Sequence, residues 1–119
     1  VPVLSTTFAS VQKMLEYMGR EQLGLLIVDE AGQAAPQCAV GALWRAKKAI
    51  IVGDPKQVEP VVTTDETVMT LYQKKCGIVS LSSYLSKSHS VQGFADLINR
   101  YGSWIGETWV GCPLVVHRR

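Results

Sequence analysis

The sequence carries little charge and almost no excess of either sign. Charged residues make up 18% of the 119 residues, and twelve Lys and Arg stand against ten Asp and Glu, which gives a formal net charge of +2. The strongly basic balance that indicates nucleic-acid binding by electrostatics alone is therefore missing. Hydrophobic residues make up 47%, which excludes the composition typical of disordered chains. We expect one globular domain, or part of one.

Cysteine pairs and long apolar runs are absent as well. Cys38, Cys76 and Cys112 lie far apart, with no Cys-x-x-Cys pair and no histidine at metal-ligand spacing, which argues against a zinc site. We expect three reduced, buried thiols in a cytoplasmic protein. No apolar run approaches the roughly 20 residues that cross a bilayer, and no signal-peptide pattern occurs, so we expect no membrane partner.

Apolar patterning predicts strands that alternate with helices. We expect strands over 1–4, 25–28, 49–52 and 114–116, and helices over 8–18, 33–46, 66–75 and 91–99. Pro36 suits the first turn of its helix, where a missing N–H costs nothing. A Ser-rich surface loop is expected over 81–90 and a turn over 101–106.

The strands themselves indicate the fold class. Leu25–Val28 and Ala49–Val52 are apolar throughout, and such strands are typical of parallel sheets that are covered on both faces. On the last helix, an apolar face is expected from Val91, Phe94, Ala95 and Ile98. Strands separated by helices imply βαβ units. We therefore expect an α/β fold with a mostly parallel sheet flanked by helices.

Acidic residues stand at the carboxyl ends of both apolar strands. Asp29-Glu30 follows the first strand and Gly53-Asp54 follows the second. Open α/β sheets bind ligands at this end of their strands. In a nucleotide hydrolase, an Asp at such a position holds Mg²⁺ and the next carboxylate orients and deprotonates the attacking water. A lone pair of this kind could also be a solvated strand end.

The two strand ends belong to longer motifs. Residues 29–34 read DEAGQA and residues 53–60 read GDPKQVEP. Together they resemble motifs II and III of superfamily I helicases, which commonly read DEA-x-QA and GD-x-x-Q-x-x-P in the branch that includes the RNA-surveillance helicase and its bacterial relatives. Ser5-Thr6-Thr7 resembles the segment upstream of motif II that contacts nucleic acid, and 111–119 resembles the start of motif IV. The resemblance covers essentially the whole chain and is strongest over 25–62.

The resemblance implies a partial RecA-like P-loop NTPase core that uses ATP and Mg²⁺. It makes Asp29 the Mg²⁺ ligand and Glu30 the general base. Gln57 would sense the γ-phosphate, because its amide can both accept a hydrogen bond from water and donate one to phosphate. Asp54 would steady the loop that carries Gln57. The remaining implied roles are nucleotide contact for Gln33, a γ-phosphate contact for Arg119 with Arg118 as its alternative, and nucleic-acid contacts for Ser5, Thr6 and Thr7.

One departure from the family pattern changes the expected activity. The phosphate-binding loop Gly-x-x-x-x-Gly-Lys-Ser/Thr occurs nowhere in the 119 residues. The chain begins at Val1 without Met and ends at Arg119, and we interpret 1–119 as an internal segment of the first RecA-like helicase domain. We expect it to be inactive alone, to self-associate, and to need the remaining helicase domains of the same chain. Single-stranded DNA or RNA is the expected partner of the intact protein.

Two other interpretations stay open. The chain could belong to a helicase-like ATPase that does not unwind, or to a degenerate RecA-like module kept for binding proteins or nucleic acid. The intact Asp29, Glu30 and Gln57 argue against degeneration. Trp44, Trp104 and Trp109 stand apart in the sequence, and we expect core or rim positions for them rather than base stacking.

Overall fold

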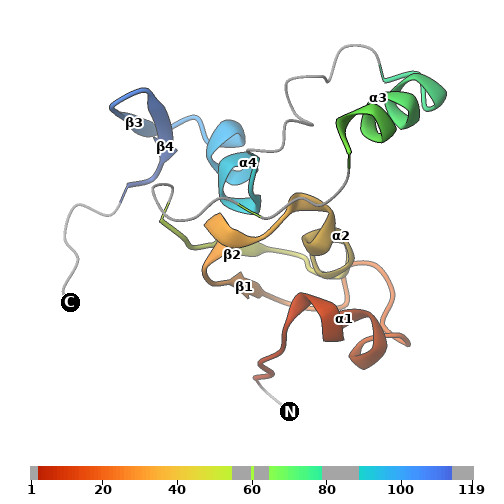
Figure 1. The fold of residues 1–119 in the computed structure, drawn as a ribbon. Helices are drawn as coiled ribbons and strands as arrows, with labels where there is room; N and C mark the ends of the chain where they lie inside the picture. The colour runs from red at the N-terminus through yellow and green to blue at the C-terminus, as the bar shows by residue number, and fades with distance from the viewer. Residues whose placement is uncertain (1–2, 55–59, 61–64, 79–88, 114–119) are drawn as a thin grey trace.

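A short parallel sheet lies at the centre of the fold. The computed structural model describes residues 3–54, 60, 65–78 and 89–113. Strands β1 (Leu26–Val28) and β2 (Ala49–Ile51) pair in parallel, with Ile27 opposite Ile50 (Figure 1). The structure is therefore α/β, as the sequence predicts, and its parallel sheet is flanked by helices. Each strand is a residue or so shorter than expected.

A short 3-10 helix and an α-helix connect the two strands. The 3-10 helix η1 (Ala31–Gln33) follows β1, and α2 (Pro36–Arg45) comes next. Pro36 occupies the first turn of α2, where a proline N–H is not needed. The single helix expected over 33–46 is therefore interrupted near its start. Each of the β1 and β2 strands runs toward the same edge of the sheet, as a βαβ unit requires.

The core is small and lies on one face of this sheet. Buried Val28, Ala31, Ala39 and Val91 form its centre, with the partly buried Phe8, Leu26, Ala34 and Ile51 packed around them. On the other face, Ile27 is 62% exposed and Ile50 is 49% exposed. The expectation that both faces are covered is wrong for the described part of the chain, because α2 and α4 pack on the same side.

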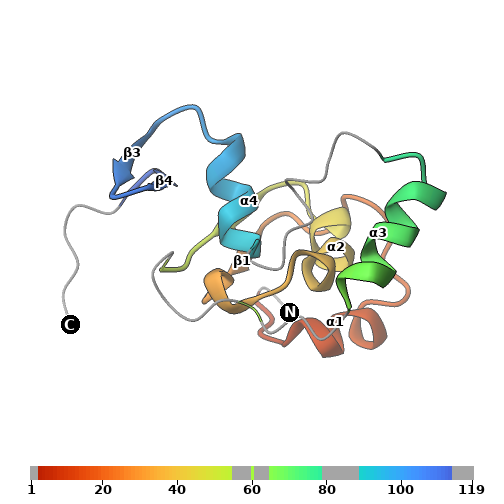
Figure 2. The same ribbon diagram turned by 45° about the horizontal axis from the view of Figure 1, so that its top comes forward.

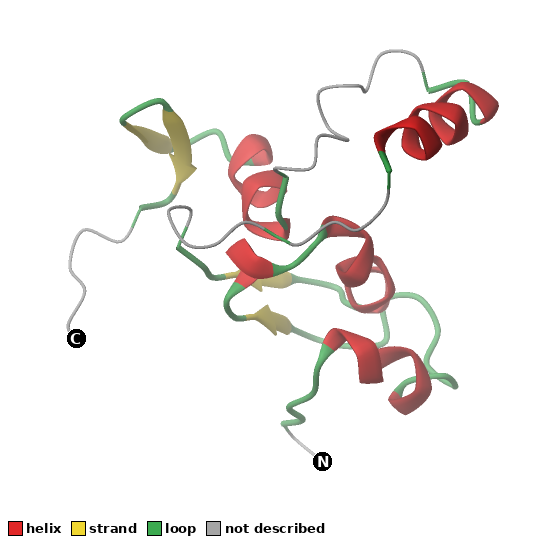
Figure 3. Ribbon diagram, viewed as in Figure 1, coloured by secondary structure: helices red, strands yellow, loops and turns green. Residues whose placement is uncertain are grey.

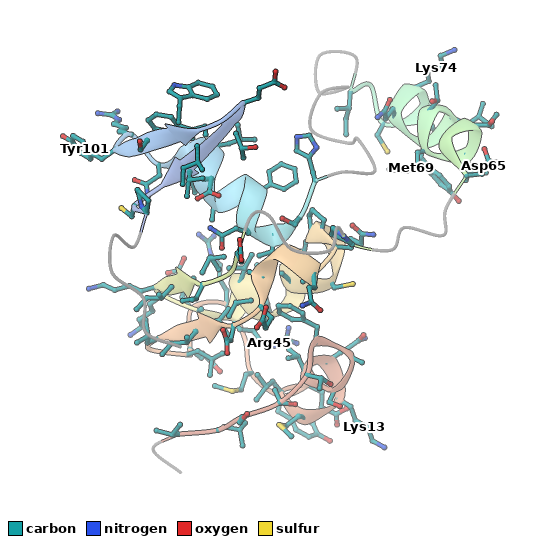
Figure 4. All side chains as sticks on the ribbon, turned by 60° about the vertical axis from the view of Figure 1, so that its left-hand side comes forward. Lys13, Arg45, Asp65, Met69, Lys74 and Tyr101 are labelled. Carbon is teal, nitrogen blue, oxygen red and sulfur yellow. The ribbon has the colours of Figure 1, made fainter. Side chains whose placement is uncertain are left out.

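The first helix ends earlier than its apolar pattern suggests. Helix α1 (Phe8–Met14) packs against α2, whereas the sequence predicts a helix as far as Met18. The chain closes in a turn instead, in which the Met18 N–H donates to the Leu15 carbonyl oxygen at 3.0 Å. The Nε–H of Arg45 also donates to the carbonyl oxygens of Leu15 (3.0 Å) and Met18 (3.1 Å), which lie past the end of the helix and need partners from outside it. Figure 4 shows Arg45 between α2 and α1. Residues 3–4, expected in a strand, are irregular.

Helix α3 (Glu66–Lys75) matches its expected bounds. The Asp65 carboxylate caps it by accepting from the Thr67 N–H at 2.7 Å, and Cys76-Gly77 follow its last turn. Figures 1 and 4 draw α3 apart from the sheet. No described side chain of this helix is buried, so its stability comes from capping and local pairing rather than from core packing.

Helix α4 (Val91–Ile98) leads into an antiparallel hairpin. Strands β3 (Gly102–Ile105) and β4 (Thr108–Gly111) pair with Trp104 opposite Trp109 (Figure 3). The turn expected over 101–106 is thus wrong. The tight turn falls instead at Gly106, whose φ of +67° suits glycine, and the two indoles meet edge to face at 5.6 Å.

Two further expectations are wrong. Ile98, expected on the buried face of α4, is 83% exposed, while the polar Gln92 and Asp96 are buried. Cys38, Cys76 and Cys112 are free thiols but all are exposed rather than buried. The strand expected over 114–116 and most of the loop expected over 81–90 lie outside the described residues.

In the described part of the chain, no helix is long and apolar enough to cross a membrane.

Candidate nucleotide site at the ends of the parallel strands

The turns that follow β1 and β2 are joined by their backbones. The Val52 N–H donates to the Val28 carbonyl oxygen at 2.8 Å, and the Ala31 N–H donates back to the Val52 carbonyl oxygen at 2.9 Å. The second of these bonds lies beyond the strands and joins Ala31 of the expected motif II to Val52, the residue just before the expected motif III. The structure therefore brings the turn with Asp29-Glu30 beside the turn with Gly53-Asp54.

Two glycines allow this close approach. A Cβ atom on Gly32 would lie 2.8 Å from the Asp54 carbonyl oxygen, and one on Gly53 would lie 2.8 Å from the Gly32 nitrogen. Real Cβ atoms do not come so close to backbone atoms. Steric crowding thus explains why both sequence motifs contain a glycine here. The backbones of the two turns touch, and a side chain at either position would push them apart.

Asp29 and Glu30 are both exposed at the end of β1. The Glu30 N–H donates to Oδ1 of Asp29 at 3.0 Å. Glu30 itself has φ 53° and ψ 38°, a left-handed conformation that costs a residue with a Cβ about 1–2 kcal/mol. Such backbone strain clusters at functional sites. The strain turns the chain sharply after β1 and leaves the Glu30 carboxylate in solvent at the edge of the sheet.

Magnesium suits the donor set at this edge. Carboxylate oxygens are hard ligands, and Mg²⁺ usually keeps several waters while one or two carboxylates and the substrate phosphates complete its shell. The bond from Glu30 takes one of the two oxygens of Asp29, and the side chain is exposed. No group of three or more His, Cys, Asp or Glu in the described ranges could form an all-protein metal cage. Asp29 therefore fits a site that is completed by water and phosphate.

The other expected site residues divide into two groups. Gln33 in η1 and Asp54 after β2 are exposed at the same edge of the sheet as Asp29 and Glu30. Gln57 and Arg119, with its alternative Arg118, lie outside the described residues. The structure thus brings together the motif II residues and Asp54.

Ser5, Thr6 and Thr7 are exposed in the segment that enters α1. The carbonyl oxygen of Thr7 accepts from the Ser10 and Val11 N–H groups, and its hydroxyl donates to the Ser10 hydroxyl at 3.3 Å. Phe8, directly after Thr7, packs against the cluster that contains Ala31. This contact fixes the start of α1 against the core, and residues 5–7 lead into it.

One comparison with known proteins gives a match. A family model described as an AAA domain matches residues 2–65, which include both strand ends and the turns that follow them. The chain belongs to this AAA domain family. AAA domains of this helicase-like type are P-loop NTPase domains that generally use a nucleotide and Mg²⁺. The searches of curated proteins and of solved structures found no match.

The sequence interpretation missed two residues beside the site of this AAA domain. Gln92 and Asp96 are buried on α4, and Oε1 of Gln92 lies 3.2 Å from where a Cβ on Gly53 would be. A signal was available, because the two polar side chains stand four residues apart and so share one helix face. The apolar residues around them predict a different buried face of the helix.

Proposed function

We propose that the chain supplies the Mg²⁺-binding and water-activating half of the ATPase site of a superfamily I helicase, in the branch that includes the RNA-surveillance helicase. In this proposal Asp29 binds Mg²⁺, Glu30 is the general base, and Gln33 and Asp54 contact or steady the nucleotide side of the site. Gln57 and Arg119 act at the γ-phosphate, and Ser5, Thr6 and Thr7 contact single-stranded DNA or RNA.

The observation that carries the proposal is the contact between the two turns. Helix α2 separates the two motifs in the sequence, yet the Ala31–Val52 hydrogen bond joins motif II to the residue before motif III, and Gly32 and Gly53 let the two turns touch. Glu30 directly precedes Ala31, whose N–H makes this contact. Its left-handed backbone is shared by Glu21 and Cys112 outside the site, so the contact between the turns carries the proposal. A general base must be held in a fixed position, and the joined turns provide that support.

Chemically, the chain's residues would work through charge and placement. Asp29 would bind the metal that is complexed with the triphosphate, and that metal would neutralise charge on the β- and γ-phosphates. Glu30 would accept the proton of the attacking water from the solvent-facing edge of the sheet. The phosphate-binding loop, which occurs nowhere in the 119 residues, would come from the rest of the first RecA-like domain, and the other wall of the site would come from the second. For that reason we expect the 119-residue chain alone to show no ATP turnover above background.

The decisive test is Glu30→Gln in the full-length protein. The amide keeps the side-chain size but cannot accept the proton, so we expect turnover to fall by about 100-fold or more, as loss of a general base does. Binding of Mg·ATP, measured by calorimetry, should change little. Glu16→Gln, at an exposed position outside this site, is the matched control and should keep full activity.

Two results would contradict the proposal. Loss of nucleotide binding in Glu30→Gln would mean that the carboxylate is structural. Full turnover in the same variant would mean that Glu30 is not the base. A degenerate module that only binds its partners would instead show neither nucleotide binding nor turnover in the unmodified full-length protein.

A further inference from the structure

Helix α4 connects the candidate site to the hairpin. Its Val91 N–H donates to the Ala34 carbonyl oxygen at 2.9 Å, just after η1, and the helix also packs on β2 and β4. Figures 1 and 2 both place α4 between the parallel sheet and the hairpin. The helix therefore contacts both the segment after η1 and the hairpin.

A buried polar pair on α4 makes that connection specific. Gln92 and Asp96 are 6% and 4% exposed, and Nε2 of Gln92 donates to Oδ1 of Asp96 at 3.1 Å. The same Oδ1 accepts from the Gly111 N–H at 2.9 Å. The Trp109 indole N–H donates to the Asp96 carbonyl oxygen at 3.1 Å. Asp96 thus ties Gln92 to two residues of β4, Trp109 and Gly111.

The other end of the Gln92 amide faces the site. Because Nε2 is engaged by Asp96, Oε1 is fixed on the opposite side, next to Gly53. This oxygen is buried and has no hydrogen-bond partner among the described residues. A buried acceptor without a donor is energetically unfavourable, and such an atom calls for an explanation. A state in which an N–H of the neighbouring turn, or a trapped water, donates to Oε1 would remove that cost.

We propose that Gln92 is a positioning residue of the nucleotide site, which couples the Gly53-Asp54 turn to Asp96 and through it to the β3–β4 hairpin. The inference rests on the proposed function, since the nucleotide is what moves the turn. Nucleotide bound at the strand ends favours the turn position in which Oε1 is paired. The hairpin then responds through the Asp96 bonds to Gly111 and Trp109. Gln92 touches neither nucleotide nor Mg²⁺.

The test follows the hairpin and nucleotide binding separately in the full-length protein. Tryptophan is replaced by 5-fluorotryptophan, and the ¹⁹F resonance of Trp109 is assigned by Trp109→Phe. Mg²⁺ with a non-hydrolysable ATP analogue is the ligand, and calorimetry measures its binding. We expect the analogue to shift the Trp109 resonance in the unmodified protein. In Gln92→Met, which keeps the side-chain length, the shift should disappear while the analogue still binds.

Turnover provides a second readout. Gln92→Met should lower kcat by about tenfold, which corresponds to about 1.4 kcal/mol, with KM nearly unchanged. Gln12→Met makes the same chemical change at an exposed position of α1 and should change neither kcat nor the resonance. If Gln92→Met does not fold, the same measurements are made on variants of Asp96. Asp96→Asn keeps an acceptor for Gln92 and Gly111 and should retain the Trp109 shift, whereas Asp96→Ala should lose it.

The outcomes separate this inference from the proposed function. If the analogue binds but the Trp109 shift is absent, or persists in Gln92→Met or Asp96→Ala, Gln92 is only a buried structural residue and the inference is wrong. The proposed function would then still stand. If the analogue does not bind to the unmodified protein, the proposed function fails and the inference falls with it.

Discussion

At the scale of single residues, Glu30 has both a proposed chemical role and a strained backbone, and two substitutions can separate the effects of the two. Both Glu30→Gly and Glu30→Ala remove the carboxylate, but only glycine adopts φ 53° without strain. We expect Glu30→Gly to be more stable than Glu30→Ala by about 1 kcal/mol, because relief of the left-handed strain exceeds the extra chain entropy of glycine. Chemical denaturation of the two variants measures the difference. Equal stabilities would mean that the strain is not present in solution.

Gly53 provides a second test at this scale. In Gly53→Ala the new Cβ would meet backbone nitrogens of Gly32 at 2.8 Å and Ala31 at 3.0 Å, and backbone atoms cannot turn aside as a side chain can. We expect a loss of about 1–3 kcal/mol, typical of overpacking, together with impaired turnover. Gly24→Ala is the control, because nothing lies within 4 Å of its Cβ. A neutral Gly53→Ala would mean that the two turns are not in contact.

At the scale of elements, Arg45 holds the end of α1 against α2. Besides the two bonds to Leu15 and Met18, its Nη1 donates to the Gly41 carbonyl oxygen at 2.8 Å. Arg45→Met keeps the aliphatic stem but removes the side-chain donor of the half-buried Met18 carbonyl, while the Leu15 carbonyl keeps the Met18 N–H. We expect a loss of about 1–3 kcal/mol in the free energy of unfolding. Arg20→Met breaks only the exposed ion pair with Glu21, and it should cost less than about 1 kcal/mol. Thermal unfolding of the two variants should rank them in this order.

The elements that could be predicted from the sequence are those with local signals. Helix α3 has an aspartate cap at Asp65 and a glycine beyond its end, and the parallel strands end in the acidic residues that mark the site. The hairpin could not be placed because its strands depend on the pairing of Trp104 with Trp109. The burial of Asp96 depends on Gly111, which lies fifteen residues further along the chain. Such contacts exist only after the tertiary fold has formed.

At the scale of the whole molecule, the described part of the chain leaves apolar surface open. The uncovered face of the sheet carries Leu25, Ile27, Ile50 and Val52, which are 52%, 62%, 49% and 39% exposed. Among the described residues β2 pairs only with β1, so one edge of Ala49–Ile51 has no strand beside it. Exposed edges and apolar faces pair with other chains. We therefore expect the 119-residue chain to form a dimer or an exchanged-segment oligomer.

Light scattering across a dilution series tests this expectation, with Ile27→Lys as the variant that should weaken association. The side chain of Ile27 is 62% exposed on the open sheet face, so lysine is tolerated there by the monomer but opposes burial against another copy. Leu71→Lys is the matched control, because Leu71 is also 62% exposed but lies on α3. If both variants dissociate equally, the sheet face is not the contact. A chain that stays monomeric at high concentration would contradict self-association altogether.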